Sequence, residues 1–217
     1  MLKKLHFECS QADPCLFIRV EKNGNITYVL VYVDDLLVDG YSEKVTMKVD
    51  KKLDHLFQMK DLGEVSNYIG MQIDRETDGS FVHHQKLKIA ILLENFGLQE
   101  PKPAKMHMEV GLLASESVEC PRLPDKQRYQ QAIGSLLYLA TVSRSDIAVA
   151  VGILCCKVAA PREQDWKAVK HVMHYLATTI EWGLKFPEGD NLQLLCHADA
   201  DWAGDQSDRK STSGYVL

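Results

Sequence analysis

The sequence lacks any apolar run as long as a membrane-spanning helix, and its start, MLKKLHFECS, lacks the apolar core of a signal peptide. It also lacks a CxxC pair, because its 6 cysteines are scattered along the chain. Scattered cysteines without a secretory context are typical of reduced, mostly buried thiols. We therefore expect an intracellular protein of the cytoplasm or nucleus, neither secreted nor associated with a membrane.

An excess of positive charge is missing as well. The 25 lysines and arginines are outnumbered by 30 aspartates and glutamates, which gives a formal net charge of −5. Such a chain repels phosphate on average, so binding of nucleic acid would need a local basic groove. The 217 residues are 46% hydrophobic and 25% charged, which indicates a globular protein with one large domain or two small ones.

Strand-forming residues dominate the first part of the sequence. Residues 15–20 and 26–33 are rich in β-branched and aromatic side chains, and the Asn-Gly pair between them predicts a hairpin turn with positive φ angles. The second strand runs into Asp34 and Asp35, after which apolar residues resume. A second hairpin should therefore carry this acid pair at its tip. A helix with one apolar stripe is expected over residues 43–59.

Further along, residues 67–73 and 80–84 predict another hairpin, with Asp78 and Gly79 in its turn. This alternation of hairpins and helix predicts the α+β class, with helices on one face of an antiparallel sheet. The later elements expected from periodicity and turn residues are a long loop over 98–128, helices over 86–96, 129–143, 146–158 and 162–180, and strands over 183–186 and 192–198.

Asp34 and Asp35 need an explanation, because adjacent carboxylates repel each other and gain nothing from burial. A surface turn in water tolerates them, and this is the simplest interpretation of an isolated Asp-Asp pair. A bound divalent cation would also offset their repulsion, because hard Mg²⁺ prefers oxygen ligands. Two-metal phosphoryl transfer needs such carboxylates on a rigid support. The pair alone leaves both alternatives open.

Sequence motifs that occur in a fixed order favour the interpretation of the acid pair as a cation site. They are ADPCLF (12–17), YVLVYVDDLLV (28–38), FQMKDLGE (57–64), YIGMQI (68–73), YQQAIGSLLYLA (129–140), DWKAVKHVMHYL (165–176) and ADADWAGDQSDRKSTSGYVL (198–217). Together they make nearly the whole chain resemble the Pol polyprotein of copia-type LTR retrotransposons. Within it, YVDD resembles the catalytic hairpin of reverse transcriptases.

The resemblance implies three parts. Residues 1–84 would form a partial reverse-transcriptase palm of antiparallel hairpins plus a helix, with the YVDD hairpin and a primer-grip-like hairpin. Residues 85–187 would form a helical thumb and connection. Residues 188–217 would be the truncated start of an RNase H-like α/β domain.

The resemblance also implies roles for single residues. Asp34 and Asp35 would be catalytic and bind Mg²⁺ or Mn²⁺, and Asp199 would be a metal ligand of the RNase H domain. The residues expected to contact the primer are Tyr32, Tyr68, Ile69, Gly70 and Met71. The implied partners are an RNA or DNA template–primer and deoxynucleotides.

Departures from the family pattern limit the expected activity. Reverse transcriptases take a further metal-binding aspartate from an upstream strand, which would precede Met1, and Asp13 falls on a different motif. We therefore expect a fragment with little or no polymerase activity alone. The alternative is a non-catalytic remnant or a co-opted fragment that binds protein or nucleic acid. Missing neighbour strands would also leave an exposed sheet edge, through which the chain would self-associate.

His171 and His174 lie three residues apart on an expected helix, a spacing that can hold a metal ion. No third ligand lies nearby in the sequence. The sequence therefore favours a pair on the helix surface or partly buried over a metal site.

Overall fold

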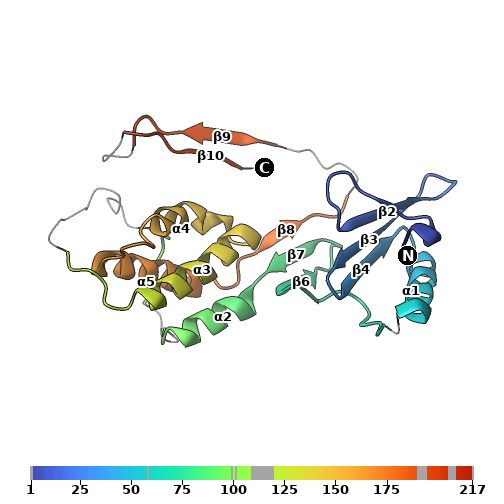
Figure 1. Cartoon of the computed structure of the whole chain (residues 1–217), viewed down its shortest axis with the longest axis horizontal. Helices are drawn as coiled ribbons and strands as arrows, with labels where there is room; N and C mark the ends of the chain where they lie inside the picture. Colours follow the sequence, from blue (N-terminus) through green and yellow to red (C-terminus); the bar gives the residue numbers. More distant parts are fainter. Residues whose placement is uncertain are drawn as a thin grey trace. The chain divides into compact units, whose positions relative to one another are not determined.

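The computed structural model describes residues 2–57, 59–98, 100, 102–108, 120–189, 195–204 and 209–216. The chain divides into two compact units, Met1–Val65 and Ser66–Leu217 (Figure 1). Each unit contains its own four-stranded sheet, and each is described by itself.

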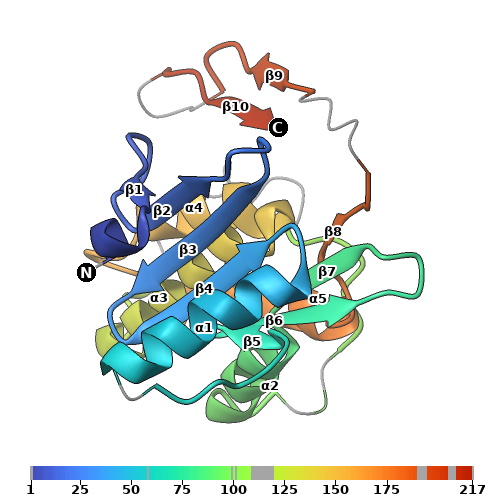
Figure 2. The ribbon, with the colours of Figure 1, turned by 90° about the vertical axis from the view of Figure 1, so that its right-hand side faces the viewer.

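The first unit is built on an antiparallel sheet with the strand order β1-β2-β3-β4. Its elements are η1 (Leu2–Leu5), β1 (Glu8–Cys9), β2 (Leu16–Val20), β3 (Ile26–Tyr32), β4 (Asp35–Gly40) and α1 (Glu43–Phe57). The helix α1 lies against one face of this sheet, next to β4 (Figure 2).

Alternation along β3 decides which face of the first sheet is buried. Val29 is fully buried on the side of α1, whereas its neighbour Tyr28 points to the opposite side and is exposed. Val49 and Leu53, one turn apart on α1, pack with Val29 and Phe7 in a small core. The side of the sheet opposite α1 carries partly exposed apolar residues.

The second unit contains a sheet with the strand order β5-β6-β7-β8, again antiparallel. Its strands are β5 (Asn67–Tyr68), β6 (Met71–Arg75), β7 (Phe81–His84) and β8 (Leu184–Phe186). Because β8 pairs with β7, segments on both sides of the helical region share one sheet. Two later strands, β9 (His197–Ala200) and β10 (Ser213–Val216), pair with each other.

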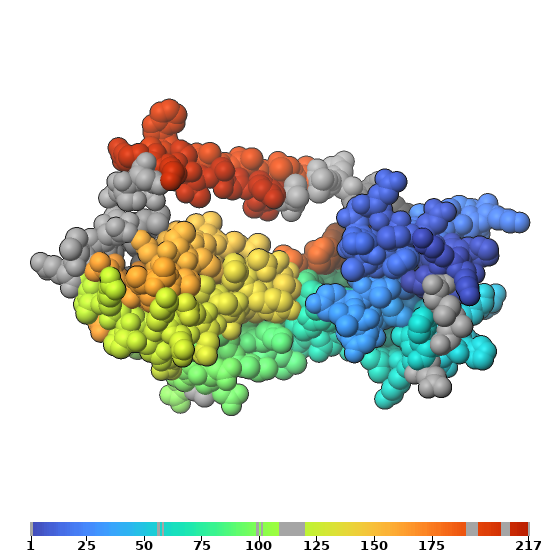
Figure 3. Space-filling model, in the orientation of Figure 1, coloured from blue at the N-terminus to red at the C-terminus, as the bar shows by residue number. Residues whose placement is uncertain are grey.

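Helices form the larger part of the second unit. They are α2 (Lys86–Asn95), α3 (Lys126–Val142), η2 (Ser145–Ile147), α4 (Ala148–Cys155) and α5 (Glu163–Thr178). In the space-filling view α2 to α5 pack into one continuous block (Figure 3). Leu136, Ile147, Val169 and Leu176 are among the side chains that this block buries completely.

A charged network lies inside this helical block. Arg144 is 1% exposed and donates from Nε and Nη2 to the carboxylate of Asp146, at 3.0 and 2.8 Å. It also donates to the carbonyl and hydroxyl of Thr179, and the Tyr175 hydroxyl donates to Asp146. Burial raises the pKa of Asp146, but the bonds from Arg144 and Tyr175 outweigh it and hold the pKa below its usual value.

The α+β class predicted from the sequence is confirmed, with antiparallel sheets and five α-helices in the described residues. Helix α2 ends before Gly97, which has the positive φ angle of a helix stop, as the sequence predicts. Helix α3 begins three residues earlier than expected, because the Asp125 side chain accepts a hydrogen bond from the Arg128 N–H and caps it.

Other expectations were wrong in detail. The single strand expected over 67–73 is broken into β5 and β6 by a turn at Ile69 and Gly70, both with positive φ. In the first hairpin Gly24 alone takes the positive φ angle, without Asn23. The helix expected over 146–158 begins as the 3-10 turn η2, and its α-helical part ends at Cys155. In the strand expected over 192–198, residues 192–194 lie outside the described residues.

The structure divides the chain after Val65, whereas the sequence suggested a boundary after His84. The hairpin over residues 67–84, for which the sequence predicts a primer-grip-like role, therefore belongs to the second unit, together with the helices. Assignment of the parts as palm, thumb and RNase H start stays a prediction.

Candidate functional site

The acid pair lies at the two-residue turn between β3 and β4. Tyr32 pairs with Asp35, so Val33 and Asp34 form the turn and Asp35 opens β4. Val33 has a φ angle of 53° and is 87% exposed. Such a turn normally has glycine at its first central position, and a β-branched residue there is strained by about 1–3 kcal/mol.

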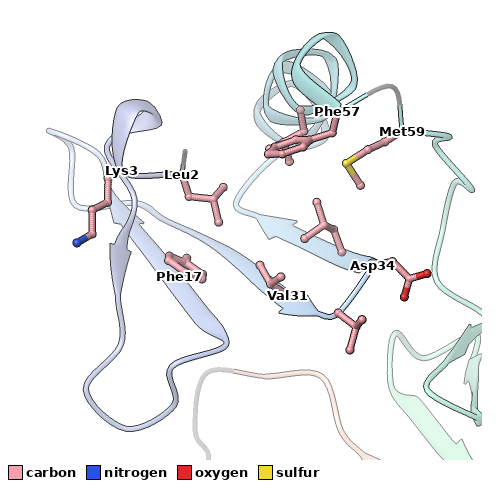
Figure 4. A pocket seen from close by; sticks show the side chains of 10 residues that line it. Leu2, Lys3, Phe17, Val31, Asp34, Phe57 and Met59 are labelled. Carbon is pink, nitrogen blue, oxygen red and sulfur yellow. The ribbon is translucent and has the colours of Figure 1, made fainter.

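The two carboxylates of this turn belong to different surroundings. Alternation from Leu36, which faces α1, places Asp35 on the opposite face of the sheet, the face of its pairing partner Tyr32. Asp34 instead contributes to a cavity of about 490 Å³ on the α1 side (Figure 4). The other residues that line this cavity are mostly apolar: Leu2, Lys3, Phe17, Val31, Val33, Leu36, Leu53, Phe57 and Met59.

The donor chemistry of the turn suits a hard divalent cation. Carboxylate oxygens are the ligands that Mg²⁺ and Mn²⁺ prefer, and Asp34 and Asp35 are adjacent on a hairpin that fixes their direction. Each carboxylate fills only part of a six-coordinate shell. Within the described ranges, no three His, Cys, Asp or Glu side chains gather where they could hold one ion.

The second predicted site segment is the turn between β5 and β6. Ile69 and Gly70 have φ angles of 52° and 74°, as a type I′ turn requires, and Tyr68 pairs with Met71 across it. The carbonyl of Ile69 accepts a hydrogen bond of 2.7 Å from the hydroxyl of Tyr138 on α3. Helix α3 therefore supports this turn directly.

Asp199 lies on β9, opposite Gly214 of β10, and is exposed. Asp201, two residues further on, accepts hydrogen bonds from the backbone N–H groups of Thr212 and Gly204. No metal-ligating group of three forms around Asp199 in the described part of the chain.

Of the predicted site residues, the structure brings Tyr32, Asp34 and Asp35 together on one hairpin of the first unit. Tyr68 to Met71 form a turn of the second unit, and Asp199 lies on a later hairpin of that unit.

His171 and His174 do not form a metal site with each other. His174 accepts the Lys102 N–H at Nδ1, at 3.2 Å, and His171 Nε2 is bonded to the Met106 carbonyl, at 2.9 Å. Both rings therefore hold residues 102–108 against α5, in keeping with the partly buried pair that the sequence favours.

A family model described as "Reverse transcriptase (RNA-dependent DNA polymerase)" matches residues 1–110, which contain both turns. This chain belongs to the reverse transcriptase family. Retrotransposon proteins agree with that assignment along nearly the whole sequence.

Among curated relatives of this reverse transcriptase family chain, the retrovirus-related Pol polyprotein from transposon TNT 1-94 of Nicotiana tabacum is 34% identical over 95% of the chain. The match covers only 16% of that polyprotein. An uncharacterized mitochondrial protein of Arabidopsis thaliana is 36% identical over 87% of the chain and 77% of its own length. A putative transposon Ty5-1 protein of Saccharomyces cerevisiae is 32% identical over 99% of the chain and 69% of its own length.

The retrotransposon polyproteins confirm the copia-type resemblance predicted from the motifs. No solved structure gives a significant match to this reverse transcriptase family chain. Across the residues that the structure describes, no helix combines the length and apolar character needed to cross a bilayer.

Two site neighbours in this reverse transcriptase family chain were not predicted from the sequence. Tyr138 lies in the YQQAIGSLLYLA motif, which assigns it no role, and Lys88 is one polar residue of the helix expected over 86–96. Their contacts with the Ile69–Gly70 turn join residues far apart in sequence. The only local signal was Gly70 inside a strand-like run, which is a sign of close backbone approach or a turn.

Proposed function

We propose that this chain supplies part of the active site of an RNA-directed DNA polymerase, in which two divalent metal ions promote nucleotidyl transfer. The observation that carries the proposal is the presentation of Asp34 and Asp35 at a strained hairpin turn. Local strain of this kind is typical of functional sites, where the surrounding structure keeps it in place. Membership in the reverse transcriptase family supports the same conclusion.

In this proposal Asp34 and Asp35 are ligands of Mg²⁺ or Mn²⁺. The metal ions, when bound, lower the energy of the charge that develops on the attacking and leaving oxygens. Tyr32 lies on the same face as Asp35 and would support the 3′ end of the primer. The turn residues Tyr68, Ile69, Gly70 and Met71 would hold the primer strand.

The remaining finer assignments have less support. We propose that β9 and β10 belong to an RNase H-like domain with Asp199 as a metal ligand, because the ADADW motif resembles that family. The implied partners are an RNA or DNA template–primer and deoxynucleotides, in the cytoplasm or nucleus. The edge strand β4 is exposed along part of its length and would allow self-association.

We further propose that the acid pair acts together with another carboxylate, as in the family, and that the 217-residue chain alone has little or no polymerase activity. Two-metal transfer requires more oxygen ligands than two carboxylates provide. An adjacent pair that lacks a third acid would hold the ions weakly.

Primer extension tests this proposal. Purified chain is incubated with a primer–template, deoxynucleotides and Mg²⁺ or Mn²⁺, and Asp34→Asn serves as the matched control with the same shape and no charge. Wild type and variant should both give background extension. Robust extension that Asp34→Asn abolishes would show that the chain carries a complete polymerase site.

Sedimentation of the same sample tests the proposed self-association. A single monomeric species at all concentrations would contradict it.

The alternative of a non-catalytic fragment that binds nucleic acid or protein gives the same extension result. Binding separates the two, because a polymerase part should prefer a primer–template to single-stranded nucleic acid. Loss of that preference, together with background extension, would favour the non-catalytic alternative.

A further inference from the structure

The Ile69–Gly70 turn rests on two helices of the second unit. Tyr138 from α3 donates its hydroxyl proton to the Ile69 carbonyl. A Cβ atom placed on Gly70 would lie 3.3 Å from the Tyr138 hydroxyl and 2.9 Å from Cε of Lys88 on α2. Glycine is favoured here by its φ angle of 74°, and a side chain at this position would displace the flexible end of Lys88.

The backbone of the turn requires this support. Ile69 has a φ angle of 52°, and a β-branched residue there is strained, whereas Asn-Gly is the usual sequence of such a turn. A strained conformation persists where neighbouring groups fix it, and the hydrogen bond from Tyr138 is such a group. Its 2.7 Å length is that of a well-formed O–H···O bond.

Lys88 places a positive charge against the same turn. A Cβ on Gly70 would lie 3.5 Å from its Nζ atom, and the side chain is exposed. Its neighbour Lys86 is paired with Glu181 at 2.6 Å, whereas Lys88 forms no ion pair with the described residues. Lys88 therefore offers an unneutralised ammonium group beside a backbone turn that lacks a side chain at Gly70.

We infer that Lys88 binds a backbone phosphate of the nucleic-acid strand that lies on the Ile69–Gly70 turn, and that Tyr138 is the positioning residue that holds this turn in place. The inference rests on the proposed function, which assigns the turn to the primer strand. An ammonium group is a compact charge that pairs with phosphate, and it gains affinity by releasing counterions. The net charge of the chain is −5, so such a local cation is what binding of nucleic acid requires.

Salt-dependent binding tests the role of Lys88. The probe is a fluorescent primer–template duplex with a recessed 3′ end, and anisotropy gives Kd at several salt concentrations. Lys88→Gln should reduce the slope of log K against log salt by about 0.9, the value for one phosphate contact. Lys88→Arg should keep the slope. Lys167→Gln, an exposed lysine of α5, is the matched control and should change it much less.

Tyr138→Phe tests the positioning role, since it removes one hydroxyl and keeps the ring. It should weaken binding roughly threefold to tenfold, as expected for one hydrogen bond, and leave the salt slope unchanged. This combination separates it from Lys88→Gln. Thermal melts of both variants check that the fold is kept.

The outcomes are distinct. If the wild-type chain binds the duplex and Lys88→Gln keeps the wild-type slope, the phosphate contact is wrong while the proposed function stands. If Tyr138→Phe binds as tightly as wild type, the positioning role is wrong. If the wild-type chain does not bind the duplex at all, the assignment of a nucleic-acid partner fails, and this inference fails with it.

Discussion

The Val33–Asp34 turn of the first unit and the Ile69–Gly70 turn of the second both place a β-branched residue at positive φ directly after a tyrosine. Their surroundings differ. Val33 is 87% exposed, whereas Ile69 is half-buried and its carbonyl is bonded to Tyr138. The acid turn is thus fixed mainly by its own hairpin, and the other turn is fixed by a helix. Strain of equal kind is supported in one case by pairing strands and in the other by tertiary contacts.

The two units also differ in the size of their buried cores. In the first, the described buried core consists of Phe7, Val29, Val49 and Leu53. In the second, buried side chains from α2, α3, α4 and α5 form a larger core, which also encloses the Arg144 network. A small core resists local opening less than a large one, so the acid turn should open at lower free energy than the Ile69–Gly70 turn.

The largest effect is expected from Asp146→Ala. This change leaves the guanidinium of Arg144 buried without its carboxylate partner, which should destabilise the second unit by about 3–5 kcal/mol. Amide hydrogen exchange measures each unit separately, which matters because two units need not unfold in one step. Exchange should accelerate in α3 and α5 and stay unchanged in β3.

Lys185→Ala is the matched control for that change. Lys185 pairs with Asp78 at 3.0 Å, and both side chains are more than half exposed. Loss of such a surface pair should cost less than about 1 kcal/mol. Equal effects of the two variants would mean that the Arg144 network does not stabilise the helical block.

A smaller effect is expected when glycine replaces the strained residue of each turn. Val33→Gly should stabilise the first unit by about 0.5–1 kcal/mol, because relief of about 1–3 kcal/mol of strain exceeds the entropic cost of glycine. Ile69→Gly should gain less or lose stability, since it also removes a half-buried side chain. Urea unfolding, monitored by hydrogen exchange, measures the stability change of both variants. A destabilised Val33→Gly variant would show that Val33 is not strained.

Local signals predicted the hairpins around β3 and the helices α1, α2 and α5, because alternation, turn residues and apolar stripes lie within a few residues of one another. They also predicted that the acid pair lies at a hairpin tip, although Asp34 alone is in the turn and Asp35 opens β4. The Ile69–Gly70 turn was missed because isoleucine is a strand residue by propensity. Its conformation is fixed by Tyr138, a residue 69 positions away.

The same limit applies to the other unpredicted features. The partners of Arg144 include Thr179, 35 positions away, so no local pattern indicates the network. The contact of Lys88 with Gly70 likewise depends on how α2 packs in the second unit. Residue roles that depend on such packing cannot be derived from periodicity, whereas the acid pair could be found because it is a local sequence feature.

The smallest expected effect is a pH dependence of the stability of the second unit. Burial lowers the pKa of His174, and the nearby charges of His171, Lys102 and Lys170 lower it further. Because the neutral ring accepts the Lys102 N–H, its stabilisation of the second unit is complete above the unfolded pKa of about 6.5 and is lost as the pH falls through the lower folded value. The loss of stability should stay below about 1 kcal/mol, the net value of one hydrogen bond.

The free energy of unfolding of wild type and of His174→Asn, measured at pH 7.5 and at pH 5, tests this pH dependence. The variant should lose less stability over this range than wild type, and an equal loss would place the pH dependence elsewhere.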